Sequence, residues 1–208
     1  MNKVEAMRLL SKRILECRLC RLWENRTHAV PGEGNLDAEI MFIGEAPGRF
    51  EDLEGRPFVG AAGKLLTELV EGIGLRREDV YITNVVKCRP PGNRDPKPDE
   101  IRTCSPYLDE QIQIIRPSII VTLGRHSTGY ILSRVGISTT GISRVRGRIF
   151  KVSYPPGINV IVIPTYHPAA ALYNPKIKDY LKRDFHLIKR CLSEVRREDK
   201  KIGLEKFL

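Results

Sequence analysis

The sequence predicts a three-layer α/β/α sandwich whose central sheet is mainly parallel. Four apolar runs, rich in β-branched residues, recur along the chain: AEIMFIGE, DVYITNVV, SIIVTLG and NVIVIPTY. Segments between them carry helical periodicity, as in GKLLTELVEGIGL and DEIRTCSPYLDEQIQIIRP. Near-continuous apolar strands that alternate with amphipathic helices are typical of a parallel sheet covered by helices on both faces.

The remaining elements flank these runs. MNKVEAMRLLSKRILE has apolar residues at helical spacing among charges, which predicts an amino-terminal helix rather than a secretory signal. VRGRIFKV predicts a shorter strand near the sheet edge, and PKIKDYLKRDFHLIKRCLSEVRRE predicts a long final helix. No repeat or low-complexity linker divides the 208 residues, so we expect one domain over residues 1–208.

The charge balance favours a polyanionic partner. Lysine and arginine number 35 against 25 aspartate and glutamate residues, which gives a formal net charge of +10. Such a charge suits nucleic acid, although a solvated, charge-rich surface of the kind found in heat-stable proteins explains it equally well. No apolar run reaches the ~18 residues that cross a bilayer. We therefore expect an intracellular, cytoplasmic protein associated with the nucleoid and not with a membrane.

The loops that follow the strands are the places to look for chemistry, because open parallel sheets bind ligands beyond the carboxyl ends of their strands. These loops are rich in Gly, Pro, Asn, His and aromatic residues. They are GEAPGRFEDLEGRPFVGAAG, NVVKCRPPGNRDP, GRHS and TYHPAAALYNP.

The cysteines predict a metal centre. Cys17 and Cys20 form a C-x2-C pair, and Cys88 and Cys104 form a distant C-x15-C pair. Two close and two distant thiolates can complete one tetrathiolate site, which ties the amino-terminal helix to the core. At this point structural zinc, an iron–sulfur cluster and unrelated buried thiols all remain open. Cys191, next to apolar residues of the final helix, is interpreted as a buried cysteine without a ligand role.

Three motifs together resemble a known family. GEAPGRFEDLEGRPFVGAAGKLL, YITNVVKCRPPGNRDP and PTYHPAAALYNP, with the four cysteines, are similar to the family 4 uracil-DNA glycosylases of thermophilic bacteria and archaea over residues 10–190. The resemblance implies hydrolysis of the bond between uracil and deoxyribose in DNA, the first step of base excision repair after cytosine deamination. It also implies the α/β/α fold and a [4Fe-4S] cluster bound by Cys17, Cys20, Cys88 and Cys104.

The same resemblance assigns residues to uracil binding. It places Glu45, Ala46 and Pro47 against the base, and Phe58 offers an aromatic face for stacking unless it is an ordinary core residue. Asn84 is expected to donate to uracil O4 and to accept from N3–H, which rejects cytosine. The alternative for Asn84 is a turn asparagine that satisfies backbone groups.

Catalysis is expected to stabilise the negative charge that develops on uracil O2. His167 is the predicted donor to that oxygen, and the alternative is a structural histidine that caps a loop. We interpret His28, His126 and His186 as structural or simply exposed. A related family positions the attacking water with an aspartate where this chain has Ala46. Backbone carbonyls, Glu45 or Asn93 are then the candidates for holding the water.

Glu51 is also counted among the catalytic candidates, because it lies in the matching motif. We expect its side chain to lie near C5 of the base and to help exclude the methyl group of thymine. Leu172 or Tyr173 is expected to fill the gap left in the base stack, or else to pack as an ordinary loop residue.

The expected partner is uracil-containing DNA, bound by a monomer, and the tail GLEKFL is a candidate peptide for a sliding clamp. Two other functions are compatible with these residues. One is a non-catalytic nucleic-acid-binding protein stabilised by zinc, and the other is a glycosylase for a different deaminated base, such as hypoxanthine or xanthine.

Overall fold

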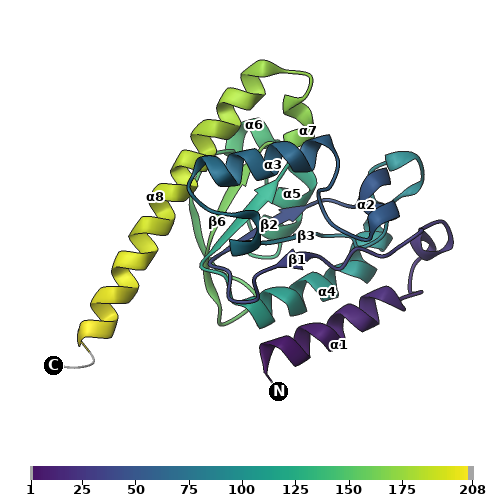
Figure 1. The fold of residues 1–208 in the computed structure, drawn as a ribbon, viewed down its shortest axis with the longest axis horizontal. Helices are drawn as coiled ribbons and strands as arrows, with labels where there is room; N and C mark the ends of the chain where they lie inside the picture. Colours follow the sequence, from purple (N-terminus) through teal and green to yellow (C-terminus); the bar gives the residue numbers. More distant parts are fainter. Residues whose placement is uncertain (1, 206–208) are drawn as a thin grey trace.

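The computed structural model describes residues 2–205 and the side chains of residues 2–198. Its centre is a six-stranded sheet with the strand order β1-β3-β2-β4-β6-β5 (Figure 1). The four predicted apolar runs form the four inner strands, and the predicted edge strand is β5. The strands are β1 (Glu33–Gly34), β2 (Ile40–Gly44), β3 (Tyr81–Asn84), β4 (Ile119–Leu123), β5 (Phe150–Ser153) and β6 (Asn159–Thr165).

The inner strands are parallel to one another and the two edge strands are antiparallel. β2 pairs in parallel with β3 and β4, and β4 pairs in parallel with β6. β1 and β5 pair antiparallel with β3 and β6. Every residue of β2 and β4 is buried, as expected for strands covered on both faces. The two-residue strand β1 was not predicted, because it is too short to show an alternating pattern.

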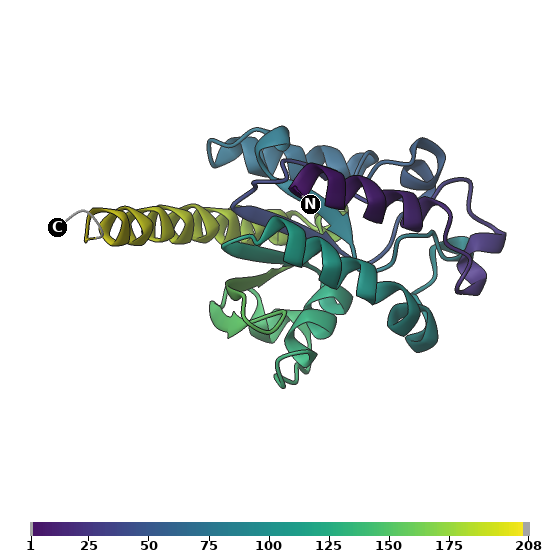
Figure 2. The ribbon, with the colours of Figure 1, turned by 90° about the horizontal axis from the view of Figure 1, so that it is seen from below.

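Helices cover both faces of the sheet, so the predicted three-layer α/β/α fold is confirmed (Figures 1 and 2). One face carries α1 (Lys3–Leu15), α4 (Pro98–Ile115) and α5 (Arg125–Ser133). The other carries α3 (Ala61–Gly72), α7 (Pro168–Ala171) and α8 (Pro175–Glu205). The short helices are α2 (Arg49–Glu54), α6 (Ile142–Val145), η1 (Arg21–Glu24), η2 (Arg77–Asp79) and η3 (Pro91–Asn93).

The amino-terminal helix α1 is fixed at both ends. Its first turn is capped by Asn2, whose side-chain oxygen accepts a hydrogen bond from the backbone N–H of Glu5 at 2.8 Å. Near its end, Arg13 pairs with Glu110 of α4 at 2.6 Å. Buried Met7, Leu10 and Ile14 hold the helix against the core. The turn that follows α1 lies beside α4, since Cys17 and Cys20 share a cavity with Cys104 of α4.

The final helix α8 packs its first part on the sheet and projects beyond it (Figures 1 and 2). Phe185 of α8 stacks on Phe42 of β2 with ring centroids 5.6 Å apart. The candidate clamp peptide begins at Gly203 inside α8, and its residues 206–208 lie outside the described residues. No helix in the described part of the chain is long and apolar enough to cross a membrane.

Candidate active site

A cavity of about 360 Å³ opens at the carboxyl ends of the inner strands. Three of the four loops predicted from the sequence contribute to its lining: the turn after β2, the segment after β3 and the loop after β6. All seven residues predicted to bind substrate or to act in catalysis line this one cavity. The lining residues are Glu45, Ala46, Pro47, Gly48, Glu51, Phe58, Ala62, Asn84, Pro90, Asn93, Arg94, Asp95, His167 and Ala169.

Asn84 ends strand β3 with a buried amide that lacks a partner. The residue is 2% exposed, and among the described residues its Oδ1 is the one buried side-chain polar atom without a hydrogen bond. Its neighbour Val85 donates a backbone hydrogen bond to the carbonyl oxygen of Gly44 at 3.0 Å, which holds the strand end in place. A buried acceptor left unpaired costs about 1–3 kcal/mol. Asn84 Oδ1 is therefore available to a donor brought by a ligand.

Gly44 lets Asn84 and Phe58 meet in the cavity wall. A Cβ atom at position 44 would lie 2.3 Å from Asn84 Oδ1 and 2.7 Å from Phe58 Cζ. Any larger side chain would displace both groups. Phe58 is buried, and its backbone φ of 51° lies in the left-handed region that non-glycine residues seldom adopt.

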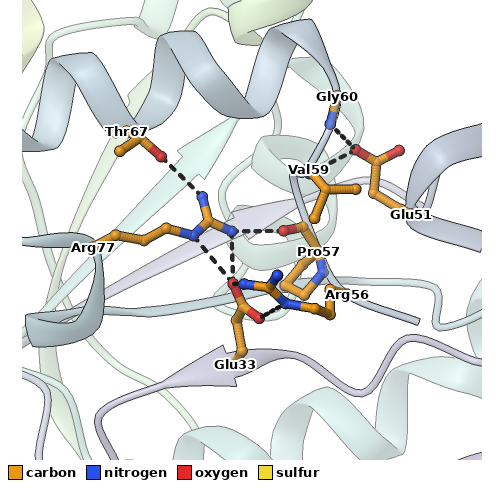
Figure 3. A network of polar contacts seen from close by, with 8 residues as sticks. All are labelled: Glu33, Glu51, Arg56, Pro57, Val59, Gly60, Thr67 and Arg77. Carbon is orange, nitrogen blue, oxygen red and sulfur yellow. Dashed lines mark hydrogen bonds and ion pairs between the residues drawn. The ribbon is translucent and has the colours of Figure 1, made fainter. Parts of the chain in front are cut away.

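The loop that carries Phe58 is held from two sides (Figure 3). On one side Glu51 Oε1 accepts hydrogen bonds from the backbone N–H groups of Val59 at 3.0 Å and Gly60 at 3.1 Å. On the other side Arg77 donates to the carbonyl oxygen of Pro57 at 2.6 Å. Arg77 is itself fixed by Glu33 at 2.9 Å and by Thr67 at 3.1 Å. These contacts offset the strained backbone of Phe58.

Glu51 lies in the cavity wall but is engaged by the backbone. Besides Val59 and Gly60, the N–H of Gly48 donates to Glu51 Oε2 at 3.1 Å. A carboxylate that accepts three backbone hydrogen bonds is poorly placed to take a proton from water. Through these contacts Glu51 positions the turn after β2 and the Phe58 loop. The expected catalytic role of Glu51 stays a prediction. Exclusion of the thymine methyl group remains a prediction.

His167 follows β6 and caps α7. Its Nδ1 accepts a hydrogen bond from the backbone N–H of Ala169 at 3.1 Å, so the neutral ring carries its proton on Nε2. Burial lowers the pKa of His167 to about 4. The ring stacks against Phe58, with centroids 5.6 Å apart and planes 27° from parallel. The site therefore holds a neutral imidazole that is a donor at Nε2.

Glu45 begins the turn after β2 and has an altered acidity. Burial raises the pKa of Glu45 to about 7. The negative charge of Asp95 adds to this effect of burial, and the Arg125 guanidinium opposes it. Arg125 donates to Asp95 Oδ2 at 2.5 Å. Glu45 therefore gains and loses its proton close to neutral pH, as a general base at that pH requires.

His126 lies beside Glu45, although we expected it to be structural or exposed. Its Nε2 is 3.7 Å from Glu45 Oε2 and 3.2 Å from Asp95 Oδ2, and it accepts from Arg125 Nε at 2.8 Å. The sequence contained a signal for this group, because GRHS follows a buried strand and Asp95 lies in the RPPGNRDP motif. What it lacked was the distance between these two loops.

The other predicted residues lie as follows. Leu172 and Tyr173, the candidate wedge residues, follow α7 and are 43% and 90% exposed. Asn93 lines the cavity, and its Oδ1 accepts from Arg89 Nε at 2.7 Å. His28 is structural, since its Nδ1 lies 3.0 Å from the carbonyl oxygen of Asp52.

The four predicted cysteine ligands line a second, smaller cavity. Cys17 and Cys20 lie in the turn after α1, Cys88 follows β3, and Cys104 lies on α4. All are free thiols without disulfide bonds. Cys191 is buried in the core on the opposite face of the sheet, as expected for a cysteine without a ligand role.

Two of the sulfur atoms in the cysteine centre, by which we mean Cys17, Cys20, Cys88 and Cys104, lie within hydrogen-bond distance of N–H donors. Arg26 Nη1 lies 3.0 Å from Cys88 Sγ, and the backbone N–H of Lys87 donates to Cys104 Sγ at 3.2 Å. Such donors suit thiolate rather than thiol sulfur.

The sulfur spacing also separates two kinds of metal centre. Within the described residues, the one set of three ligating side chains whose donor atoms all lie within 4.8 Å of one another is Glu45, Asp95 and His126. No three of the cysteine sulfurs are that close together. Thiolates around a single tetrahedral zinc ion lie about 3.8 Å apart, so the four cysteine sulfurs as they stand do not form a closed tetrahedral zinc site.

Known proteins resemble this chain over most of its length. The model of the uracil DNA glycosylase superfamily matches residues 31–189. A type-4 uracil-DNA glycosylase of Saccharolobus solfataricus is 56% identical over 96% of this chain and 90% of its own length. The type-4 enzymes of Archaeoglobus fulgidus and Thermotoga maritima are 52% and 49% identical, over 89% and 83% of this chain and 92% and 86% of their own lengths.

Proposed function

The chain belongs to the uracil-DNA glycosylase superfamily, and from that membership we propose the roles of its pocket residues. The protein is a uracil-DNA glycosylase, an enzyme that hydrolyses the bond between uracil and deoxyribose in DNA. This bond lies inside the base stack, so the nucleotide has to rotate out of the duplex into a pocket. The orphaned acceptor Asn84 Oδ1 is the observation that carries the assignment of the cavity.

Asn84 selects uracil. Its Oδ1 accepts from uracil N3–H while its amide N–H donates to O4. Cytosine presents a bare N3 and an amino group at these positions, so both hydrogen bonds are lost and two buried polar groups stay unpaired. Because each unpaired group costs about 1–3 kcal/mol, the pair of mismatches rejects the far more abundant normal base.

Phe58 and His167 act on the bound base. The ring of Phe58 stacks on the pyrimidine, an interaction of about 1–3 kcal/mol in the binding of single-stranded nucleic acid. His167 Nε2–H donates to O2, where negative charge collects as the glycosidic bond breaks. A neutral imidazole can perform this task, because its Nε2–H donates a hydrogen bond to the developing anion although the ring carries no positive charge.

Glu45 holds the attacking water, and the backbone of Ala46 and Pro47 contacts the base. Ala46 stands where a related family has a water-positioning aspartate, and Glu45 is the neighbouring ionisable group in the cavity. With a pKa raised to about 7, its carboxylate can take a proton as the water attacks the sugar cation. Asp95, His126 and Arg125 set its charge and orientation.

The cysteine centre holds a [4Fe-4S] cluster. The cysteine sulfurs are more widely spaced than those around a single zinc ion, which supports this choice. When bound, the cluster supplies a cross-link between the turn after α1, the segment after β3 and helix α4. Purified protein should then be brown, with broad absorption near ~400 nm and bound iron; a colourless protein that binds zinc would contradict this assignment.

The enzyme acts on DNA as a monomer and a single domain, in the cytoplasm. Its net charge of +10 attracts the phosphates that flank the lesion. Leu172 or Tyr173, exposed beyond α7, fills the gap left by the everted nucleotide. A sliding clamp bound through the carboxyl-terminal tail is a further candidate partner.

Release of the free base from matched oligonucleotides that contain uracil, thymine, cytosine or hypoxanthine tests this function. The native protein should release uracil without added metal and leave cytosine intact. Asn84→Ala should slow uracil release at subsaturating substrate by about 10- to 100-fold, the effect of losing one to two buried hydrogen bonds. Asn35→Ala, on the exposed surface, is the matched control and should behave as the native protein. Hypoxanthine release in preference to uracil would indicate the other base specificity.

A further inference from the structure

Asp184 of α8 is a buried carboxylate that lies outside the lining of the active-site cavity. The residue is 2% exposed, and its Oδ2 accepts hydrogen bonds from the hydroxyl of Thr165 at 2.6 Å and from Arg146 Nε at 3.0 Å. Arg146 Nη2 donates to the other carboxylate oxygen. An acidic side chain is seldom fully buried unless it is paired, and the Arg146 guanidinium supplies the counter-charge.

The pair of Asp184 and Arg146 joins three parts of the chain that are distant in sequence. Asp184 lies on α8, Thr165 is the last residue of β6, and Arg146 follows α6. Next to Arg146, the backbone N–H of Gly147 donates to the carbonyl oxygen of Pro164 in β6 at 2.8 Å. A Cβ atom at position 147 would lie 2.7 Å from Asp184 Oδ1, so this close approach requires glycine. Both α8 and the turn after α6 therefore hold the carboxyl end of β6.

The end of β6 leads directly to His167. The carbonyl oxygen of Thr165 accepts a hydrogen bond from the backbone N–H of Gly124 at 2.9 Å. A Cβ atom at position 124 would lie only 3.1 Å from His167 Cβ, so the two backbones are in close contact. The ring of Tyr166, between Thr165 and His167, has its centroid 5.8 Å from Arg146 Cζ. Thr165 is thus fixed through its side chain and its backbone, one residue away from His167.

We propose that Asp184 is a positioning residue for uracil release, which acts through Thr165 on the imidazole of His167. A donor to a developing anion is effective when it is already in place, and a displacement of about 1 Å can cost about 10²-fold in rate. By fixing the end of β6, Asp184 sets the position from which His167 Nε2 reaches the base. This inference rests on the proposed role of His167 as the donor to uracil O2.

The test is a double-mutant cycle with Asp184→Asn, which keeps the size of the side chain and removes its charge. The single-turnover rate of uracil release at saturating DNA is measured for the native protein, Asp184→Asn, His167→Ala and the double variant. Asp184→Asn should slow the native protein about tenfold, because His167 is displaced. The same change should slow His167→Ala less than about twofold, because the group through which Asp184 acts is already absent. A carboxylate with a merely structural role would slow both proteins by the same factor.

Asp109→Asn is the matched control, because it also removes a carboxylate with several hydrogen bonds. Asp109 lies on α4, on the opposite face of the sheet from α8, and accepts from the hydroxyl of Tyr130 at 3.1 Å and from Arg134 at 3.4 Å. Asp109→Asn should change the rate of the native protein and of His167→Ala by the same factor. If Asp109 were coupled to His167 as strongly as Asp184, the cycle would report general loosening of the fold and the proposal would be overturned.

Thr165→Val covers the case in which Asp184→Asn does not fold. It removes only the hydroxyl that donates to Asp184 and keeps the ion pair between Asp184 and Arg146. Thr165→Val should slow the native protein about fivefold and His167→Ala less than about twofold, because the end of β6 loses one of its attachments.

The outcomes separate this inference from the function on which it rests. A native rate in His167→Ala would overturn the proposed role of His167, and the inference with it. If His167→Ala is slow, the positioning role of Asp184 alone is overturned by a native rate in Asp184→Asn, or by equal slowing of the native protein and of His167→Ala. Where Asp184→Asn does not fold, the same two results for Thr165→Val overturn it.

Discussion

The backbone N–H of Ala169 donates a hydrogen bond to His167 Nδ1 across 3.1 Å. This contact between residues two apart places the proton of the neutral ring on Nε2, and Phe58, stacked on the ring, holds it in the cavity wall. Local backbone geometry after β6 thus prepares the donor that the departing base requires.

Removal of that donor should slow the chemical step. His167→Ala is expected to lower the single-turnover rate by about 10²- to 10³-fold, the usual effect of losing one donor to a developing anion. His167→Gln, which retains an N–H, should lose less, and both variants should bind DNA as the native protein does. Rapid-quench measurement of uracil release checks this; an Ala variant within threefold of the native rate would contradict it.

The rate of uracil release should follow the ionisation of Glu45. With a pKa near 7, Glu45 becomes an effective base as pH rises, so the single-turnover rate should increase across neutrality with a midpoint near 7. Burial lowers the pKa of His167 to about 4, so its ring remains neutral across this range. Glu45→Gln should abolish the increase. If the rate of the Gln variant rises with pH in the same way, the increase belongs to the ionisation of another group.

The contribution of Glu45 to protein stability should fall as pH rises, whereas its contribution to the rate should increase. Its folded-state pKa lies above the unfolded value of 4.5, so the folded protein binds this proton more tightly. The contribution is fully present below pH ~4.5 and is lost as pH rises toward ~7. The difference in unfolding free energy between native protein and Glu45→Gln should therefore change in this window, as denaturant titrations at several pH values can measure.

A methyl group at position 44 should damage the pocket from within. Gly44→Ala places Cβ 2.3 Å from Asn84 Oδ1, so we expect a loss of about 1–3 kcal/mol in stability together with weaker uracil binding. Gly72→Ala is the control, because a Cβ there meets nothing within 4 Å. Thermal unfolding and uracil inhibition measure the two effects. Native uracil affinity in Gly44→Ala would mean that the wall tolerates the shift.

Loss of the Glu51 carboxylate should release the Phe58 loop. Glu51→Ala leaves the N–H groups of Gly48, Val59 and Gly60 without their acceptor, and we expect a loss of about 1–3 kcal/mol in stability. Glu54→Ala, at an exposed position of the same helix, is the control. If Glu51 also excludes thymine, the Ala variant should release thymine faster than the native protein; equal rates would leave Glu51 with its positioning role alone.

Much of the fold follows from patterns local in the chain. The buried strands β2 and β4 were predicted because an apolar run covered on both faces differs from a one-sided pattern over five consecutive residues. The long helix α8 was predicted from its apolar spacing. The location of the pocket was predicted from the rule that parallel strands end at one edge of a sheet. In the structure Asn84 and His167 line one cavity at that edge.

Other features depend on segments that are distant in sequence. Sequence patterns predicted five of the six strands, the cysteine spacing and the loops that could carry chemistry, because periodicity and motif spacing are properties of neighbouring residues. Three features could not be predicted from these patterns. Asp95 and His126 adjoin Glu45, Glu51 accepts hydrogen bonds from backbone amides, and Lys87 is buried close to Asn84 and to Cys104. Altered pKa values, buried side chains and unpaired acceptors all depend on the exclusion of solvent and on charges at close range. Both of these conditions exist only once the chain has folded.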